Sequence, residues 1–178
     1  DAVTGDLKWS HRRSLPDDVY DYVGGNSRNN RNIAIYDRFI INTSDDSFVF
    51  GLDVDTGELV WENKIFDYQV TPVGHSSGPI IADGRVISGR SCRPQGGPES
   101  CVILAHDART GEELWRVMHG GANTACPALF HKGVLFFNSG DVTNRLMAVR
   151  PDGRGDVTKT HVKWATMRGV PSVSYTHL

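Results

Sequence analysis

The chain has 178 residues, a formal net charge of -2 at pH 7 and a hydrophobic fraction of 39%. This length is enough to bury a sizeable core in a single domain. The slight negative charge argues against a nucleic-acid binder, which is normally clearly basic. The sequence also lacks the apolar run of about 18 residues that predicts a membrane-spanning helix.

One pattern, D-x-x-T-G-x-x-x-W, occurs three times along the chain. The copies begin at Asp1, Asp53 and Asp107. A degenerate fourth copy begins near Ala148, and the four repeats end near Trp9, Trp61, Trp115 and Trp164. The first three tryptophans are separated by 52 and 54 residues (61 − 9 and 115 − 61). Self-similarity at such a period is typical of repeat architectures.

Each position of the pattern has a physical role. The Asp side chain can accept hydrogen bonds from backbone N–H groups of a turn, and the Gly supplies a positive φ. The Trp can bury on the order of 150–250 Å² between neighbouring sheets. One buried Trp per repeat suits stacked sheets, because a four-stranded sheet cannot bury both of its faces alone.

The remainder of each repeat predicts further strands and no amphipathic helix. The predicted strands are 32–36, 38–42, 47–52 and 58–61, then 78–82 and 85–88, then 126–130 and 133–137. Short hairpin turns such as 82–85 connect them. Four strands in about 50 residues predict one blade of a β-propeller. We therefore predict an all-β chain of about three four-stranded antiparallel blades. A β-sandwich with chance repetition is the alternative, and the near-equal spacing of three motif copies argues against it.

The two ends of the chain indicate a fragment. The chain starts at Asp1, inside a motif, without an initiator Met or a signal peptide. Residues 173–178, Val-Ser-Tyr-Thr-His-Leu, resemble the translated sequencing-adaptor tail often seen on metagenomic reads. We interpret them as such a tail and leave them out of the fold. A targeting signal would lie upstream of Asp1.

The repeat, with an Ala or Gly two positions before its Asp, resembles the tryptophan-docking motif of the pyrroloquinoline quinone (PQQ) propeller superfamily. That superfamily includes quinoprotein alcohol dehydrogenases and cofactor-free scaffolds such as the outer-membrane assembly lipoprotein BamB. Both groups carry the motif, so the resemblance implies the fold more strongly than it implies catalysis. It predicts that residues 1–172 form a partial PQQ-repeat propeller.

Residues 1 to about 117 resemble the dehydrogenases in particular. The stretch Asn-Arg-Asn-Ile-Ala-Ile-Tyr at 30–36 resembles their N-R-G-V-A-x-Y, which implies that Arg31 contacts the cofactor. A guanidinium suits PQQ, which carries three carboxylates and an ortho-quinone. Residues 76–79 and 86–91 resemble the family's T-x-A-P and V-I-V-G-x-S, which implies cofactor contacts from the hydroxyls of Ser76 and Ser91.

Other positions depart from the dehydrogenase pattern. The family's adjacent cysteines would fall near Gly25 and Asn26 and are absent. The family's Ca²⁺-binding segment S-G-A-E corresponds to residues 91–94, which are Ser-Cys-Arg-Pro and lack the Glu. Glu99, in the longer loop, is a candidate substitute. The family's G-T-G-N segment resembles 138–141, which implies Asp141 as a Ca²⁺ ligand; the alternative is that Asp141 caps a turn. Ca²⁺ prefers six to eight oxygen ligands, and this sequence offers few candidates for them. The family's catalytic Asp would lie outside this chain.

Residues 118 to about 172 resemble PQQ-like repeat proteins of a non-catalytic kind. The resemblance changes from one group to the other near residues 111–117, a stretch that the dehydrogenases and the non-catalytic proteins share. Two genes joined during read assembly are therefore an open alternative to a single gene.

Cys92 and Cys101 are nine residues apart (101 − 92) on either side of a Pro- and Gly-rich loop. In an oxidising compartment they could form a disulfide worth roughly 2–3 kcal/mol. Metal binding is the alternative, but two cysteines without a nearby His make a poor Zn²⁺ site. Cys126 is interpreted as a small buried hydrophobic residue.

The resemblance implies a periplasmic or secreted quinoprotein dehydrogenase that uses PQQ and Ca²⁺ to oxidise alcohols or similar small substrates. A cytochrome or a similar acceptor would receive the electrons. The alternative is a non-catalytic propeller that presents its loops to protein partners; neither nucleic-acid binding nor a membrane span is expected. The isolated fragment is expected to be inactive, because three blades cannot close a ring.

Overall fold

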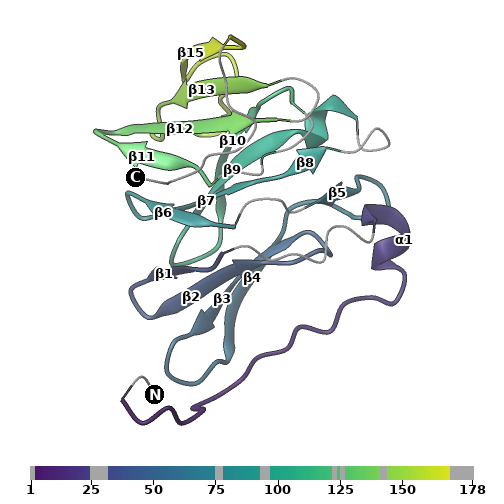
Figure 1. The fold of residues 1–178 in the computed structure, drawn as a ribbon, viewed down its shortest axis with the longest axis vertical. Coiled ribbons are helices and arrows are strands. Elements are labelled where there is room, and N and C mark those ends of the chain that lie inside the picture. Colours follow the sequence, from purple (N-terminus) through teal and green to yellow (C-terminus); the bar gives the residue numbers. More distant parts are fainter. Residues whose placement is uncertain are drawn as a thin grey trace.

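A computed structural model gives the fold shown in Figure 1. It describes residues 3–24, 32–74, 78–92, 97–121, 124, 127–140 and 144–168. Strands form most of the secondary structure, in agreement with the predicted all-β class. Among the described residues no helix combines the length and the apolar character needed to cross a membrane.

The first blade is a four-stranded antiparallel sheet in the order β1-β2-β3-β4. Its strands are β1 (Ala34–Tyr36), β2 (Phe39–Thr43), β3 (Phe48–Asp53) and β4 (Leu59–Lys64). They match the predicted strands closely at their centres. The strand predicted to begin at Ser47 begins one residue later, because Ser47 has φ of 69° and ends a turn.

The second blade contains β6 (Ile80–Ala82), β7 (Arg85–Gly89), β9 (Val102–Asp107) and β10 (Glu113–Met118). A fifth strand, β14 (Gly155–Asp156), joins it in parallel to β10 at its outer edge. The two-residue strands β5 (Val73–Gly74) and β8 (Ser91–Cys92) pair with each other beside this blade.

The third blade contains β11 (Leu129–His131), β12 (Val134–Ser139), β13 (Arg145–Val149) and β15 (Val162–Thr166). Its outer turn is longer than those of the other blades. The backbone N–H of Arg150 donates to the carbonyl of His161, eleven residues on, whereas Asp53 pairs with Glu58, five residues on. The extra residues form β14, which is why the second sheet has five strands instead of the predicted four.

The repeated Asp acts as the predicted turn cap. Asp53 Oδ1 accepts hydrogen bonds from the N–H groups of Asp55 and Thr56 at 2.9 and 3.1 Å. Asp107 Oδ1 does the same for the two residues at equivalent positions of its own turn. The pKa of Asp53 is lowered to about 2, mainly by a hydrogen bond from the Arg38 guanidinium and to a smaller extent by these backbone N–H groups. The Asp is therefore ionised at neutral pH and holds the turn that ends each repeat.

Each tryptophan of the first three repeats docks against the turn of the following blade. Trp9 Nε1 donates to the Val54 carbonyl at 3.0 Å, and Trp115 Nε1 donates to the Pro151 carbonyl at 2.7 Å. A Cβ built on Gly111 would lie 2.3 Å from Cε3 of Trp61. The glycine therefore serves two purposes, since it supplies φ of 75° and leaves room for the indole ring.

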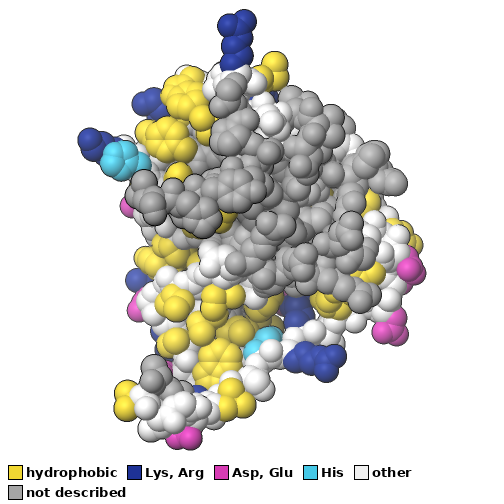
Figure 2. Space-filling model, in the orientation of Figure 1, with side chains coloured by type: hydrophobic (Ala, Val, Ile, Leu, Met, Phe, Trp, Pro, Cys, Tyr) yellow, Lys and Arg dark blue, Asp and Glu magenta, His cyan; other side chains and the backbone are white. Residues whose placement is uncertain are grey.

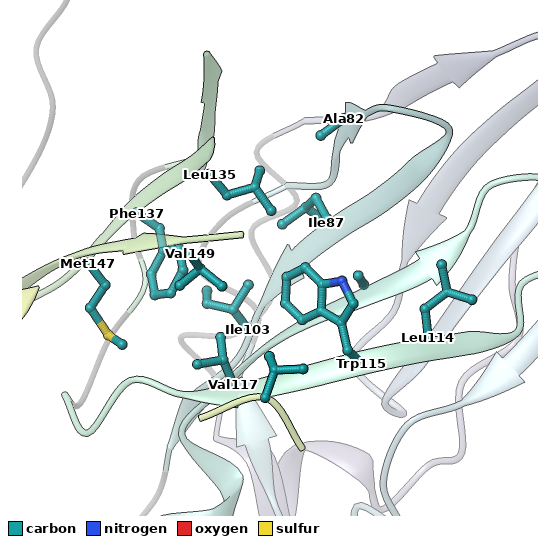
Figure 3. Packing of buried hydrophobic residues seen from close by; sticks show 12 residues of the cluster. Ala82, Ile87, Ile103, Leu114, Trp115, Val117, Leu135, Phe137, Met147 and Val149 are labelled. Carbon is teal, nitrogen blue, oxygen red and sulfur yellow. The ribbon is translucent and has the colours of Figure 1, made fainter. Parts of the chain in front are cut away.

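The blades are joined by two hydrophobic cores. The first lies between the first and second blades and includes Ile41, Val49, Val86 and Leu104. The second lies between the second and third blades and surrounds Trp115, which is fully buried. Figure 3 shows the Trp115 indole among side chains of both blades, including Ile87, Leu135 and Val149.

A short helix precedes the first blade and was not predicted from the sequence. It is α1 (Val19–Val23), and its five residues are too few to give a helical pattern. Val19 and Val23 are buried, and Figure 1 shows α1 beside β5. Before the helix, Arg13 forms ion pairs with Asp46 and Glu62 of the first blade. A single turn of 3₁₀ helix, η3 (Pro98–Ser100), follows β8.

Candidate functional site

The predicted site residues are close in sequence to the ends of described strands. Arg31 and Ser76 come shortly before the innermost strands β1 and β6, whereas Ser91 and Asp141 come shortly after the next strands, β7 and β12. In an antiparallel pair, the start of one strand lies beside the end of its neighbour. We therefore expect the four residues to lie at the same end of the propeller, opposite the capped turns.

Of these four residues, only Ser91 belongs to the part of the chain that the structure describes. Ser91 is half-buried in β8, where it pairs with Gly74 of β5. Arg31, Ser76 and Asp141 lie outside the described residues. The convergence of their side chains on one cofactor therefore remains a prediction.

The described neighbours of Arg31 and Ser76 bring two blades together at this end. Asn32 Nδ2 donates to the Pro79 carbonyl at 3.1 Å. A Cβ built on Gly78 would lie 2.2 Å from the Cβ of Asn32, so only glycine fits there. The chain thus enters β1 and β6 at adjacent points. The sequence held a signal for this contact in Gly78, which the prediction treated only as the start of a strand.

The described residues do not supply a metal centre. They contain no group of three or more His, Cys, Asp or Glu side chains placed to hold an ion. Glu99, the considered substitute for the family's Glu, is exposed, and its Oε1 lies 2.8 Å from the position that a Cβ on Gly97 would occupy. Its carboxylate therefore folds over its own η3 turn. Nothing in the described part of the chain assembles the oxygens that Ca²⁺ prefers.

Cys101 forms a disulfide bond. The other two cysteines are Cys92, whose side chain is outside the described set, and Cys126, which lies outside the described residues. The predicted pairing of Cys92 with Cys101 is therefore still a prediction, although the presence of a disulfide agrees with it.

Reduction of this disulfide should lower the unfolding free energy by about 2–3 kcal/mol, because it releases a loop in the unfolded chain. Thermal unfolding with and without a thiol reductant measures the loss. If Cys92 is the partner, Cys92→Ser removes the sensitivity to reductant and Cys126→Ser leaves it intact. The reverse result would assign the bond to Cys126.

Several buried polar side chains were not identified from the sequence. Arg90 and His106 are fully buried, and burial lowers the pKa of Arg90 to about 9. Burial, together with the positive charges of Arg90 and Arg116, lowers the pKa of His106 to about 3. His119 is also buried, and its Nε2 shares a hydrogen bond of 3.0 Å with the Arg90 carbonyl oxygen.

Stacked four-stranded sheets with a tryptophan docked between successive blades define a β-propeller array. No family model matches the chain. It is 31% identical over 180 residues to quinoprotein ethanol dehydrogenase from Pseudomonas aeruginosa, and this match covers 96% of this chain and 26% of that protein. It is 32% identical over 120 residues to quinoprotein alcohol dehydrogenase PedH from Pseudomonas putida, which covers 65% of this chain and 18% of that protein.

Solved structures with the same fold include two kinds of protein. Quinohemoprotein alcohol dehydrogenase from Comamonas testosteroni has a TM-score of 0.63 at 18% identity, over 80% of this chain and 28% of that chain. BamB from Moraxella catarrhalis has a TM-score of 0.53 at 13% identity, over 75% of this chain and 35% of that chain. The chain belongs to the PQQ-repeat β-propeller superfamily. It spans about a quarter or less of the two curated relatives.

Proposed function

We propose that this chain is part of a quinoprotein dehydrogenase that oxidises alcohols or similar small substrates. The observation that carries the proposal is the 31% identity to a quinoprotein ethanol dehydrogenase over 96% of the chain. That match extends past residue 117, where the resemblance to dehydrogenases was predicted to end. The proposed location is the periplasm or the outside of the cell, and the proposed acceptor is a cytochrome or a similar protein.

The chemistry of the predicted donor set fits PQQ. Arg31 would donate charge-assisted hydrogen bonds to a carboxylate or quinone oxygen, and the hydroxyls of Ser76 and Ser91 would donate further bonds. Bound PQQ supplies an electrophilic quinone that takes up two electrons from the substrate. The residues of this chain would hold and orient the polyanion at the end of the blades. Ca²⁺ has no ligand set among the described residues, so its binding depends on residues outside the described set, such as Asp141, or on residues outside this chain.

A non-catalytic scaffold is the second candidate. The likeness to BamB supports only the fold. A more specific observation is that the innermost strands expose apolar side chains, with Ile35 63% and Leu129 67% exposed. Figure 2 shows hydrophobic side chains along the side of the molecule where β1, β6 and β11 lie. An apolar surface of this kind would suit contact with other protein segments.

The experiment is reconstitution of the full-length protein with PQQ and Ca²⁺. The proposal predicts cofactor absorbance that stays with the protein and alcohol oxidation linked to a redox dye. Arg31→Gln should weaken PQQ binding by about 10–100-fold, because a hydrogen bond to a charged group contributes about 1.5–3 kcal/mol. Arg28→Gln, in the same segment, is the matched control and should bind within twofold of the unmodified protein.

One result would count against the dehydrogenase, and a second would count against Arg31 alone. Absence of both retained absorbance and dye reduction would favour the scaffold. Retained PQQ with equal affinity in the Arg31→Gln and Arg28→Gln variants would keep the cofactor but remove Arg31 from its site.

A further inference from the structure

Arg90 is a buried cation without a described counter-ion. Its side chain is 0% exposed. Nη1 donates to the carbonyl of the preceding residue, Gly89, at 2.9 Å, whereas Nε and Nη2 have no hydrogen-bond partner among the described residues. Of the ion pairs formed within the described part of the chain, none includes Arg90.

The strand register places other unpartnered polar atoms on the same face of the second blade. Val86 packs in the core shared with the first blade, and Ser88 and Arg90 follow it at alternate positions. His106 lies directly opposite Val86 across the β7–β9 pair. Ser88 Oγ and both ring nitrogens of His106 are buried and lack hydrogen-bond partners within the described residues. The register thus places Ser88, Arg90 and His106 on the face of the second blade that packs against the first blade, and we call these three residues the polar cluster.

The electrostatics of this polar cluster call for a negative charge. Arg90 carries a full charge at neutral pH, and it offers unused N–H groups at Nε and Nη2. Ser88 adds a hydroxyl donor, and neutral His106 adds one ring N–H donor. A buried cation without a partner is disfavoured by several kcal/mol, and buried charges in proteins are normally paired. A water molecule could accept hydrogen bonds here but would not neutralise the guanidinium.

We propose that the polar cluster binds a small inorganic anion of the chloride class. Ser88, Arg90 and His106 are each at most 1% exposed, so the occupant must be small enough to be enclosed between the blades. An organic carboxylate would need the blades to separate. The anion would tie the first blade to the second by satisfying donors in their shared interface. This site faces the adjacent blade and does not depend on the cofactor or on catalysis.

Bromide provides the direct test, because it replaces chloride and can be located by its anomalous scattering. Crystals of the full-length protein grown in bromide should show an anomalous peak within hydrogen-bonding distance of Arg90 Nη2. A peak elsewhere only, or density at the cluster that fits water alone, would overturn the proposal. This measurement uses the unmodified protein, so it holds even if variants at position 90 fail to fold.

The solution test compares unfolding midpoints in sodium chloride and in sodium gluconate at equal ionic strength. Each tenfold rise in chloride above the dissociation constant should raise the midpoint by roughly 1–4 °C. Arg90→Met should abolish this dependence, whereas Arg109→Met, which removes an exposed ion pair with Asp37, should retain it. Equal midpoints in the two salts, or stabilisation by acetate and not by chloride, would contradict an inorganic anion site.

Discussion

The Trp115→Ala variant is expected to lose about 3–5 kcal/mol of unfolding free energy. Trp115 is 0% exposed and contacts the core between the second and third blades. Its Nε1 also donates to Pro151, so the substitution leaves a cavity and removes a buried hydrogen bond across the blades. The loss is measured by urea unfolding, monitored by far-ultraviolet circular dichroism so that the signal does not depend on the fluorescence of the substituted tryptophan.

Trp164→Ala is the matched control for this prediction. Trp164 ends the next repeat but is 44% exposed, and its described ring contact is with Phe136 of its own blade. The control should lose less than half as much unfolding free energy as Trp115→Ala. Equal losses would mean that docking between blades does not stabilise the fold, which would contradict the role assigned to the repeated Trp.

The protein is expected to lose stability as the pH falls from 7 to 5, in part through His106. The folded-state pKa of His106 is about 3, whereas an unperturbed His has a pKa of about 6.5. Between these values the unfolded chain binds more protons, so acid favours unfolding. The stabilisation is fully present above the unfolded pKa and is lost as the pH falls, by up to about 1.4 kcal/mol per pH unit from this group.

The pH range of this experiment separates His106 from the carboxylates, which titrate mainly below pH 5. His106→Gln keeps a polar side chain of similar size without a titrating group, and it should flatten the dependence of the unfolding free energy on pH. His161→Gln, the same substitution at a half-exposed position, is the matched control. His119, whose pKa burial lowers to about 4, contributes a residual slope in both variants. Parallel slopes for the two variants would contradict the role of His106.

The regular part of the fold could be predicted from the sequence because each blade repeats the same local chemistry. Asp53 and Asp107 are followed by Thr-Gly, and both turns have the expected caps. The third blade could not be predicted to the same detail. Its Pro151 and Asp152 replace that turn, and nothing in their neighbourhood indicates that β14 pairs with another blade.

The buried polar residues were missed for a different reason. Arg90 precedes Ser-Cys-Arg-Pro, a stretch that looks like an exposed loop, and an Arg in such a context is normally solvated. The available signal was the alternation of Val86, Ser88 and Arg90, which continues the buried face of β7. Burial of a charge depends on the neighbouring blade, which local sequence does not specify.

The suspected junction near residue 117 bears on whether the chain comes from one gene. Trp115, before that point, shares a core with Leu135 and Val149, after it. β14 also pairs with β10, and the Met118 N–H donates to Thr158 Oγ1 at 3.0 Å. These contacts pack the residues on either side of the suspected junction into one interface between the second and third blades.

We propose that Arg31, Ser76 and Ser91 converge at one end of the blades and bind PQQ there. A crystal structure of the full-length protein grown with PQQ and Ca²⁺ tests it most directly. The account predicts cofactor density on the propeller axis, with the Arg31 guanidinium and the Ser76 and Ser91 hydroxyls within hydrogen-bonding distance of its oxygens. An empty axis at saturating PQQ, or a cofactor bound away from these three residues, would contradict it.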